Sequence, residues 1–344
     1  MQPRADLKDI PNNFPGIPPF PDDVSTAPLL RLSSGKLLAG NPGEYRRLFQ
    51  ASTDIGFFYL DLSDSEQGAS LLGDADKLFE VGAGLFELNL EEKKQYDFSG
   101  QNSYFGYKAQ GAAVVDKEGN LDRNEFYNVS KDDILGISDP LPAPEILHQS
   151  RAQLGSFMRG SHAIVTLILT ILNDQLALPK DTLPNLHRQQ STDCIGSAHR
   201  LWQRHSPLQP TGGLQVLPPG ADAEWVYVRP LPGHAIVNLG DAMVKFTNGL
   251  FRSNIHRVVA PPGLQAELTR YSLVYFARPE DSVLLRRLEG SDRIPAMEDG
   301  QTEEEINSKD WIIRRALGRR VDLVADIDFE RSAGTEQISR RIKV

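Results

Sequence analysis

The second half of the chain alternates short apolar strand-like segments with turns rich in proline, glycine and asparagine. The segments are residues 212–216, 225–228, 234–239, 256–259 and 270–276. Even spacing of short strands with such turns is typical of a β-sandwich or jelly roll, in which two sheets pack face to face.

The first half of the chain has helical rather than strand-like spacing. Residues 144–178 form the longest expected helix, and residues 64–98 and 303–317 are two more. The apolar stripe of the longest helix consists of Phe157, Ile164, Leu167, Ile168, Ile171 and Leu172. Strands are expected at residues 56–60 and 125–129. The fold class is therefore α+β, with a helical N-terminal part and a β-rich C-terminal part.

These patterns divide the chain into an ordered series of segments. They are an N-terminal arm (1–25), an N-terminal domain with the long helix (26–190), an anomalous segment (191–211), a jelly-roll half (212–285) and a C-terminal helical extension (286–344).

Charge and cysteine content exclude several classes of protein. The chain has 37 basic and 46 acidic side chains and a net charge of -9, whereas a duplex-binding protein needs a basic face. No apolar run is long enough to be an evident membrane span, so we expect neither a nucleic-acid nor a membrane partner. Cys194 is the only cysteine, which excludes an intrachain disulfide and a cysteine-based zinc site. The absence of an apolar leader-like run near residue 1 adds to an expectation of cytoplasmic localisation.

An ordered series of motifs resembles a known enzyme family. GGLQV, W-x-Y-V, PGHAIVNLGD, KFTNGLFRSNIHRVV and RYSLVYFARP follow one another from Gly212 to Pro279. This series is similar to the catalytic half of the Fe(II)- and 2-oxoglutarate-dependent oxygenases, and most of all to the isopenicillin N synthase-like group. IGFFYL and EEKKQYDF, in the first half of the chain, resemble that group's N-terminal domain.

The resemblance implies a fold and a function. The fold would be a double-stranded β-helix, or jelly roll, behind a helical N-terminal domain. The function would be hydroxylation, desaturation or cyclisation of a small organic molecule, plausibly in secondary metabolism. The cofactor would be Fe(II), with 2-oxoglutarate as cosubstrate and O2 as oxidant. We expect a monomer whose partner is a small-molecule substrate, with no catalytic residue beyond the metal site.

The family motifs assign candidate site residues. His256 occupies the S-N-x-H-R position of the distal metal-binding histidine, and Arg270 and Ser272 match the R-x-S pair that binds the tail carboxylate of 2-oxoglutarate. A planar guanidinium can pair bidentately with a carboxylate. Outside the motif series, His256 would be a hydrogen-bonded strand histidine and Arg270 a surface ion pair. The aromatic residues Tyr104, Phe105 and Tyr107 either line a substrate pocket or pack in the core.

The segment 191–211 departs from the family pattern. The family has an H-x-D metal motif before GGLQV, but here Leu201 follows two residues after His199 and offers no metal ligand. His199 lies about where the first metal-binding histidine belongs, so it is the second candidate metal ligand. The segment also lacks the alternation of apolar residues that a strand needs. We therefore expect irregular coil or a poorly packed helix, and an incomplete core, around residues 191–211.

Two explanations of this segment remain open. Ser191-Thr192-Asp193 is an altered H-T-D motif, or the segment is translated out of frame. Reading each codon from its second base permits QTALGAHTDFGSVTLLFNRL directly before GGLQV, and Trp202 with Gln203 must then give glycine. The second explanation makes the chain a product of a frameshifted gene model. A non-catalytic pseudo-enzyme that binds a ligand or a partner is the alternative function, whereas a sugar-binding jelly roll would explain neither S-N-x-H-R nor R-x-S.

Overall fold

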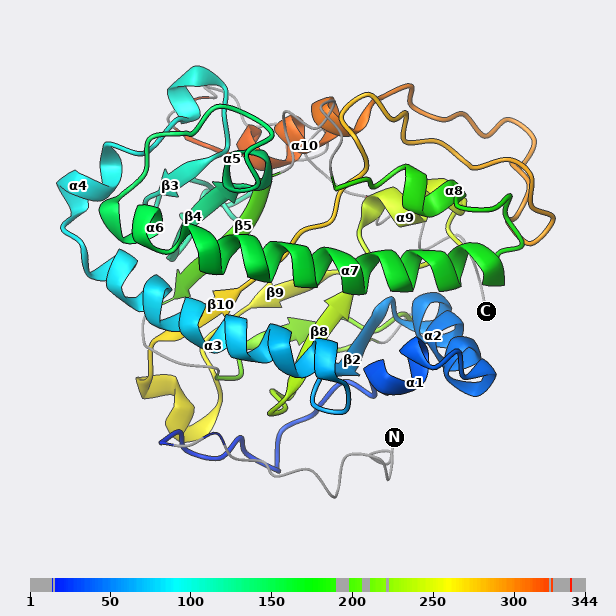
Figure 1. The fold of residues 1–344 in the computed structure, drawn as a ribbon, viewed down its shortest axis with the longest axis horizontal. Helices are drawn as coiled ribbons and strands as arrows, with labels where there is room; N and C mark the ends of the chain where they lie inside the picture. Colours follow the sequence, from blue (N-terminus) through cyan, green and yellow to red (C-terminus); the bar gives the residue numbers. More distant parts are fainter. Residues whose placement is uncertain are drawn as a thin grey trace.

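The computed structural model (Figure 1) describes most of the chain. The described residues are 14, 16–189, 198–205 by their backbone, 211–220, 223–321, 323 and 335. Helices and three β-sheets combine into the expected α+β fold.

Two long helices form one layer of the molecule. α3 (Glu66–Glu87) and α7 (Arg151–Gln175) contact each other and run side by side, as Figure 1 shows. Instead of one helix over 64–98, a second helix, α4 (Leu90–Lys94), starts where the Asn89 side chain accepts a hydrogen bond from the Glu92 amide. α7 is long and apolar enough to cross a membrane by length and composition, but half of its most apolar window is buried within the protein. We interpret it as a core helix.

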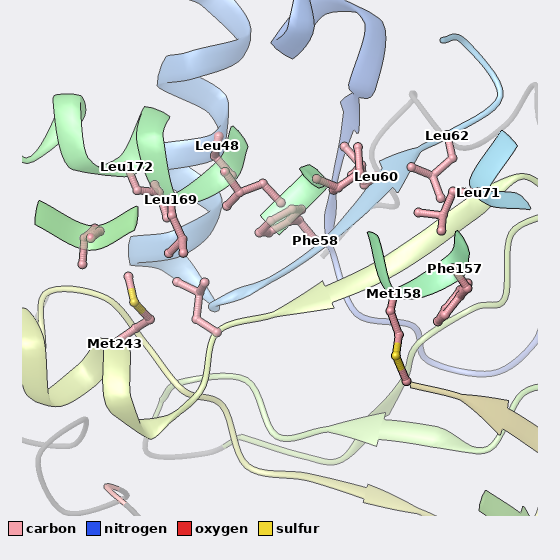
Figure 2. Packing of buried hydrophobic residues seen from close by; sticks show 14 of the residues in the cluster. Leu48, Phe58, Leu60, Leu62, Leu71, Phe157, Met158, Leu169, Leu172 and Met243 are labelled. Carbon is pink, nitrogen blue, oxygen red and sulfur yellow. The ribbon is translucent and has the colours of Figure 1, made fainter. Parts of the chain in front are cut away.

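A first sheet lies under these helices. β2 (Phe57–Asp61) pairs in parallel with β1 (Leu30–Ser33) and antiparallel with β8 (His234–Asn238). β2 is buried along its whole length. Phe58 and Leu60 join the main core, where they pack with leucines of the helices (Figure 2), whereas Phe57 and Tyr59 join a second, smaller core. Because successive residues of a strand point to opposite faces, β2 is covered on both of its faces.

A second sheet covers the other face of β2. It has the order β7 (Val226–Tyr227), β6 (Leu214–Val216) and β9 (His256–Val258), with antiparallel pairing throughout. The second core contains Val216 and Val228 beside Phe57 and Tyr59. The layers are therefore helices, first sheet and second sheet. This arrangement creates a space between two sheets, where residues of β9 can face residues of the first sheet.

A third sheet has the order β10 (Arg270–Leu273), β5 (Ala198–His205), β4 (Asn124–Ser130) and β3 (Gly106–Lys108). β5 corrects the expectation of irregular coil or a poorly packed helix over 191–211, because residues 198–205 form a strand that pairs with both β4 and β10, with one register shift opposite Tyr127 and Asn128. Backbone N–H and C=O groups on the facing edges of β4 and β10 need partners whatever the side-chain pattern, so an intervening segment gains hydrogen bonds on both sides. Residues 191–197 and 206–210 lie outside the described residues.

Several strands end their sheets. In the described part of the chain, β8 pairs only with β2, β9 only with β6, and β10 only with β5. Ile236 of β8 pairs with Tyr59 and so lies on the face of the second core, yet it is 38% exposed. The space between the sheets is therefore not fully filled on the side of β8.

Shorter elements connect and close these layers. They are α1 (Ser34–Leu38), α2 (Pro42–Asp54), η2 (Ser99–Gln101), α5 (Lys131–Ile134), α6 (Glu145–Gln149), α8 (Thr182–Asn185), α9 (Asp241–Phe246), η3 (Gly263–Glu267) and α10 (Ser308–Leu317). The closing helix starts at Ser308 rather than at residue 303, because the Asn307 side chain accepts a hydrogen bond from the Asp310 amide.

Candidate functional site

β10 presents two different faces. Tyr271 stacks on Phe86 of α3, and Leu273 and Tyr275 also pack against the main core. The Tyr275 hydroxyl lies 3.2 Å from Nδ1 of His162 on α7. Since these odd-numbered residues face the helices, Arg270 and Ser272 of β10 lie on the opposite face of the strand.

Arg270 is a cation without a carboxylate partner among the described residues. Its Nε donates a hydrogen bond to the Gly212 carbonyl at 3.0 Å, and its Nη1 donates to the Ser272 hydroxyl at 2.5 Å. Burial lowers the pKa of Arg270 to about 10, which still leaves the guanidinium charged at neutral pH. A buried charge is costly when it is unpaired. The pair is therefore suited to bind an anion, and a carboxylate matches the guanidinium geometry.

A glycine allows the chain to pass close to Arg270. Gly213, at the start of β6, has φ +100, and a Cβ there would lie 2.5 Å from the Val259 carbonyl oxygen and 3.5 Å from Cδ of Arg270. Any side chain would push β6 away from the segment that follows β9. Gly213 thus keeps the Gly212 carbonyl within hydrogen-bond reach of Arg270.

His256 is the first residue of β9. Its ring meets the ring of Phe57 edge-on, with 5.3 Å between centroids, and its backbone pairs with the buried Val216. Nδ1 lies 2.9 Å from the Asn254 carbonyl oxygen. Nδ1 therefore carries the proton and donates it to that carbonyl, which leaves the lone pair of Nε2 to face outward. A metal-binding histidine has this arrangement, with one ring nitrogen held by a carbonyl and the other available to the metal.

The described side chains do not complete an iron site. Across the described ranges, no group of three histidine, cysteine, aspartate or glutamate residues is placed to hold a metal ion. His256 is therefore a single imidazole, whereas the 2-His-1-carboxylate iron site needs three ligands. The backbone of His199 pairs with Val129 in β5, and its side chain lies outside what the structure describes. The assignment of His199 as a metal ligand stays a prediction.

A large cavity lies near the loop that holds Tyr104 and Phe105. It has a volume of about 840 Å³, and Arg278, which follows β10, also lines it. The aromatic pattern in the sequence pointed to Tyr104 and Phe105 but not to Arg278. No local signal marked Arg278, because β10 ends at Leu273 and Arg278 meets Tyr104 only through folding. Tyr107, by contrast, is buried and donates a hydrogen bond to Oε2 of Glu125 at 2.6 Å, so it packs in the core.

Comparison with known families matches both halves of the chain. Residues 203–279 match the 2OG-Fe(II) oxygenase superfamily, and residues 27–147 match the N-terminal domain of non-haem dioxygenases in morphine synthesis. A 2-oxoglutarate-dependent dioxygenase of Aspergillus fumigatus is 32% identical over 86% of this chain and 86% of its own length. A 2-oxoglutarate-dependent dioxygenase of Glarea lozoyensis is 29% identical over 76% of this chain and 83% of its own length.

Solved structures share the fold. A full-length Neurospora crassa protein in complex with alpha-KG has a TM-score of 0.69 at 19% identity, covering 84% of this chain and 95% of its own length. JOX2 in complex with 2OG, Fe and JA has a TM-score of 0.60 at 19% identity, covering 85% of this chain and 86% of JOX2. At such identities the likeness concerns the fold alone.

Proposed function

The chain belongs to the 2OG-Fe(II) oxygenase superfamily, and on that premise we propose that its family activity is the Fe(II)- and 2-oxoglutarate-dependent oxidation of a small organic molecule, with turnover requiring the H-x-D motif that residues 191–211 lack. The reaction would be a hydroxylation, desaturation or cyclisation, in the cytoplasm and in secondary metabolism. The two sheets that enclose Phe57 and Val216 would be the two faces of a double-stranded β-helix. The segments 26–190, 212–285 and 286–344 would be its N-terminal domain, catalytic half and C-terminal extension.

The observation that carries this proposal is the environment of Arg270. Its buried guanidinium contacts Ser272 and the Gly212 carbonyl, and no carboxylate among the described residues balances its charge. The distal carboxylate of 2-oxoglutarate would supply the missing anion. Arg270 would bind this carboxylate through charge-assisted hydrogen bonds, and Ser272 would add a further one from its hydroxyl.

A binding experiment without turnover tests this role. Titration calorimetry of 2-oxoglutarate should show binding by the unmodified chain, and Arg270→Gln should lower the affinity roughly 10- to 100-fold, because a hydrogen bond to a charged group contributes about 1.5–3 kcal/mol. Ser272→Ala should have a smaller effect in the same direction. Arg286→Gln is the matched control, because Arg286 is exposed and lies outside β10. Equal affinities of the Arg270→Gln and Arg286→Gln variants would contradict the proposal.

Iron would complete the site by binding the keto acid and O2. His256 would be one of its ligands through Nε2, and His199 is the candidate second ligand. Further donors would have to come from residues outside the described part of the chain, since the described side chains provide no group of three.

The incomplete set of metal ligands, together with the intact Arg270 site, favours a second candidate for the chain as written. This candidate is a non-catalytic protein that still binds 2-oxoglutarate. Leu201 stands where the family's carboxylate belongs, and β8, β9 and β10 each lack a second neighbour in the described residues. Both features follow if residues 192–211 are translated out of frame. Sequencing the transcript across codons 188–214 tests this origin. If the segment is out of frame, the transcript will encode H-T-D there; if the segment is genuine, the transcript will encode the residues as written.

A further inference from the structure

Resting on the proposed function, we infer that the cavity of about 840 Å³ beside Tyr104 binds a small organic acid, whose carboxylate pairs with Arg278 and whose apolar or aromatic body lies against the apolar lining of the cavity. Cavities of this volume are in the range of small-molecule sites, which combine a mostly apolar lining with a few polar groups that fix the ligand.

Arg278 has the properties of a ligand-binding arginine. Its guanidinium lies 5.2 Å from the ring centroids of both Tyr104 and Phe276. Nη1 donates a hydrogen bond to the Tyr104 hydroxyl at 3.1 Å. Two aromatic rings thus pack close to the guanidinium and restrict its movement. Among the described residues no carboxylate pairs with Arg278, so most of its five N–H donors remain available to an anion.

The surroundings of Arg278 favour an anion rather than a cation. Lys309 also lines the cavity, and Ser308 and Lys309 form the first turn of α10, where the helix dipole is positive. The cavity also contains three aspartates. Asp132 forms an ion pair with Lys131, and Asp281 also interacts with another group of the protein. Asp139 is exposed to solvent. Arg278, which Tyr104 holds in place at the cavity, is therefore the group positioned to meet a ligand carboxylate.

The remaining lining fits an apolar body. The rings of Tyr104 and Phe105 stack with 5.2 Å between centroids, and the loop that carries them is fixed by a hydrogen bond of 2.6 Å from Nδ2 of Asn128 to the Tyr104 carbonyl. The other apolar lining residues are Ile137, Leu141, Pro279, Ile312 and Ile313. A ligand with a planar or aliphatic body and one carboxylate would satisfy both parts of the cavity.

Binding of matched acids and amides to the full chain tests this inference without iron, O2 or turnover. The probes are phenylacetate, 3-phenylpropanoate and 4-phenylbutanoate, each compared with its neutral amide by ligand-observed NMR and calorimetry. We expect at least one acid to bind 10-fold or more tightly than its amide. Arg278→Gln should remove this preference, and Arg278→Lys should retain part of it. Arg286→Gln, which changes an exposed arginine outside the cavity, should leave the preference unchanged.

A parallel variant separates this site from the cosubstrate site. If the acids bound at Arg270, then Arg270→Gln rather than Arg278→Gln would abolish the preference, and the inference would be overturned. Equal affinity for acid and amide, or no binding of any probe at millimolar concentration, would overturn it as well. Loss of 2-oxoglutarate binding in Arg270→Gln with an intact acid preference would support both sites. The two variants therefore allow either proposal to fail without the other.

Discussion

At the scale of single residues, Gly56 decides how α2, β2 and the segment before β9 meet. It has φ +74, and a Cβ there would lie 1.9 Å from the Arg252 carbonyl oxygen. We predict that Gly56→Ala destabilises the fold by about 2–5 kcal/mol, because it adds left-handed strain to a backbone clash. Gly73→Ala is the matched control, since no atom lies within 4 Å of the position that its methyl group would take on α3. It should stabilise by up to about 1 kcal/mol. Urea unfolding of both variants measures the difference, and equal effects would contradict the close approach.

His187 makes the stability of the fold depend on pH. It is buried, its Nδ1–H donates to the Leu183 carbonyl, and burial lowers its pKa from 6.5 to about 4. Between these pH values the unfolded chain binds a proton that the folded chain does not. Stability contributed by neutral His187 is therefore present above pH 6.5 and falls as the pH drops toward about 4, by about 1.4 kcal/mol per pH unit. Unfolding of His187→Gln should show a shallower pH dependence across this window. An unchanged slope would show that His187 takes up its proton in the folded state as well.

At the scale of elements, strands and helices with a strong side-chain pattern were predictable from the sequence, and those formed by pairing alone were not. β2, β4, β6 and β8 lie within or overlap the expected segments, because alternating or continuous apolar residues mark buried strands. β1 was missed, since a short strand that pairs in parallel with β2 gives little local signal. β5 was expected to be coil, because its sequence lacks apolar alternation. Its formation depends on the edges of β4 and β10, which a local pattern does not reveal.

The same limit applies to the site. The family motifs located Arg270, Ser272 and His256, and the alternation of β10 predicted that the first two share a face. The role of Arg278 depends on Tyr104, which is far away in the sequence and comes beside it only through folding. The spacing of residues along the sequence does not reveal long-range contacts of this kind.

Amide exchange at the strand edges tests the arrangement of elements. In the described residues β10 has a neighbour on one side only, as do β8 and β9. Along an edge strand, alternate N–H groups point away from the sheet. We predict that alternate amides of β10 exchange rapidly in the chain as written, and that all of them become protected in a chain translated from the corrected frame. Uniform protection of β10 in the chain as written would show that another segment already pairs with its free edge.

At the scale of the whole molecule, a family fold is combined with an incomplete metal site among the described residues. The helical layer and the first sheet form a large continuous core, whereas the space around Ile236 and His256 remains open. Reading the codons of residues 192–211 from their second base permits both an H-T-D motif and the apolar run V-T-L-L-F, which has the composition of a strand. An out-of-frame segment over residues 192–211, entered and left by two changes of frame, would therefore account for the missing metal ligands and for the open strand edges together.

Fe(II)-dependent release of succinate from 2-oxoglutarate tests this account most directly, measured on the chain as written and on the chain translated from the corrected frame. We predict near-background release by the chain as written, because Leu201 provides no ligand where the carboxylate belongs. The corrected chain should release succinate, and His256→Ala in it should abolish that release. Strong release by the chain as written, lost on mutation of Asp193, would contradict the account and establish Ser191-Thr192-Asp193 as an altered metal motif.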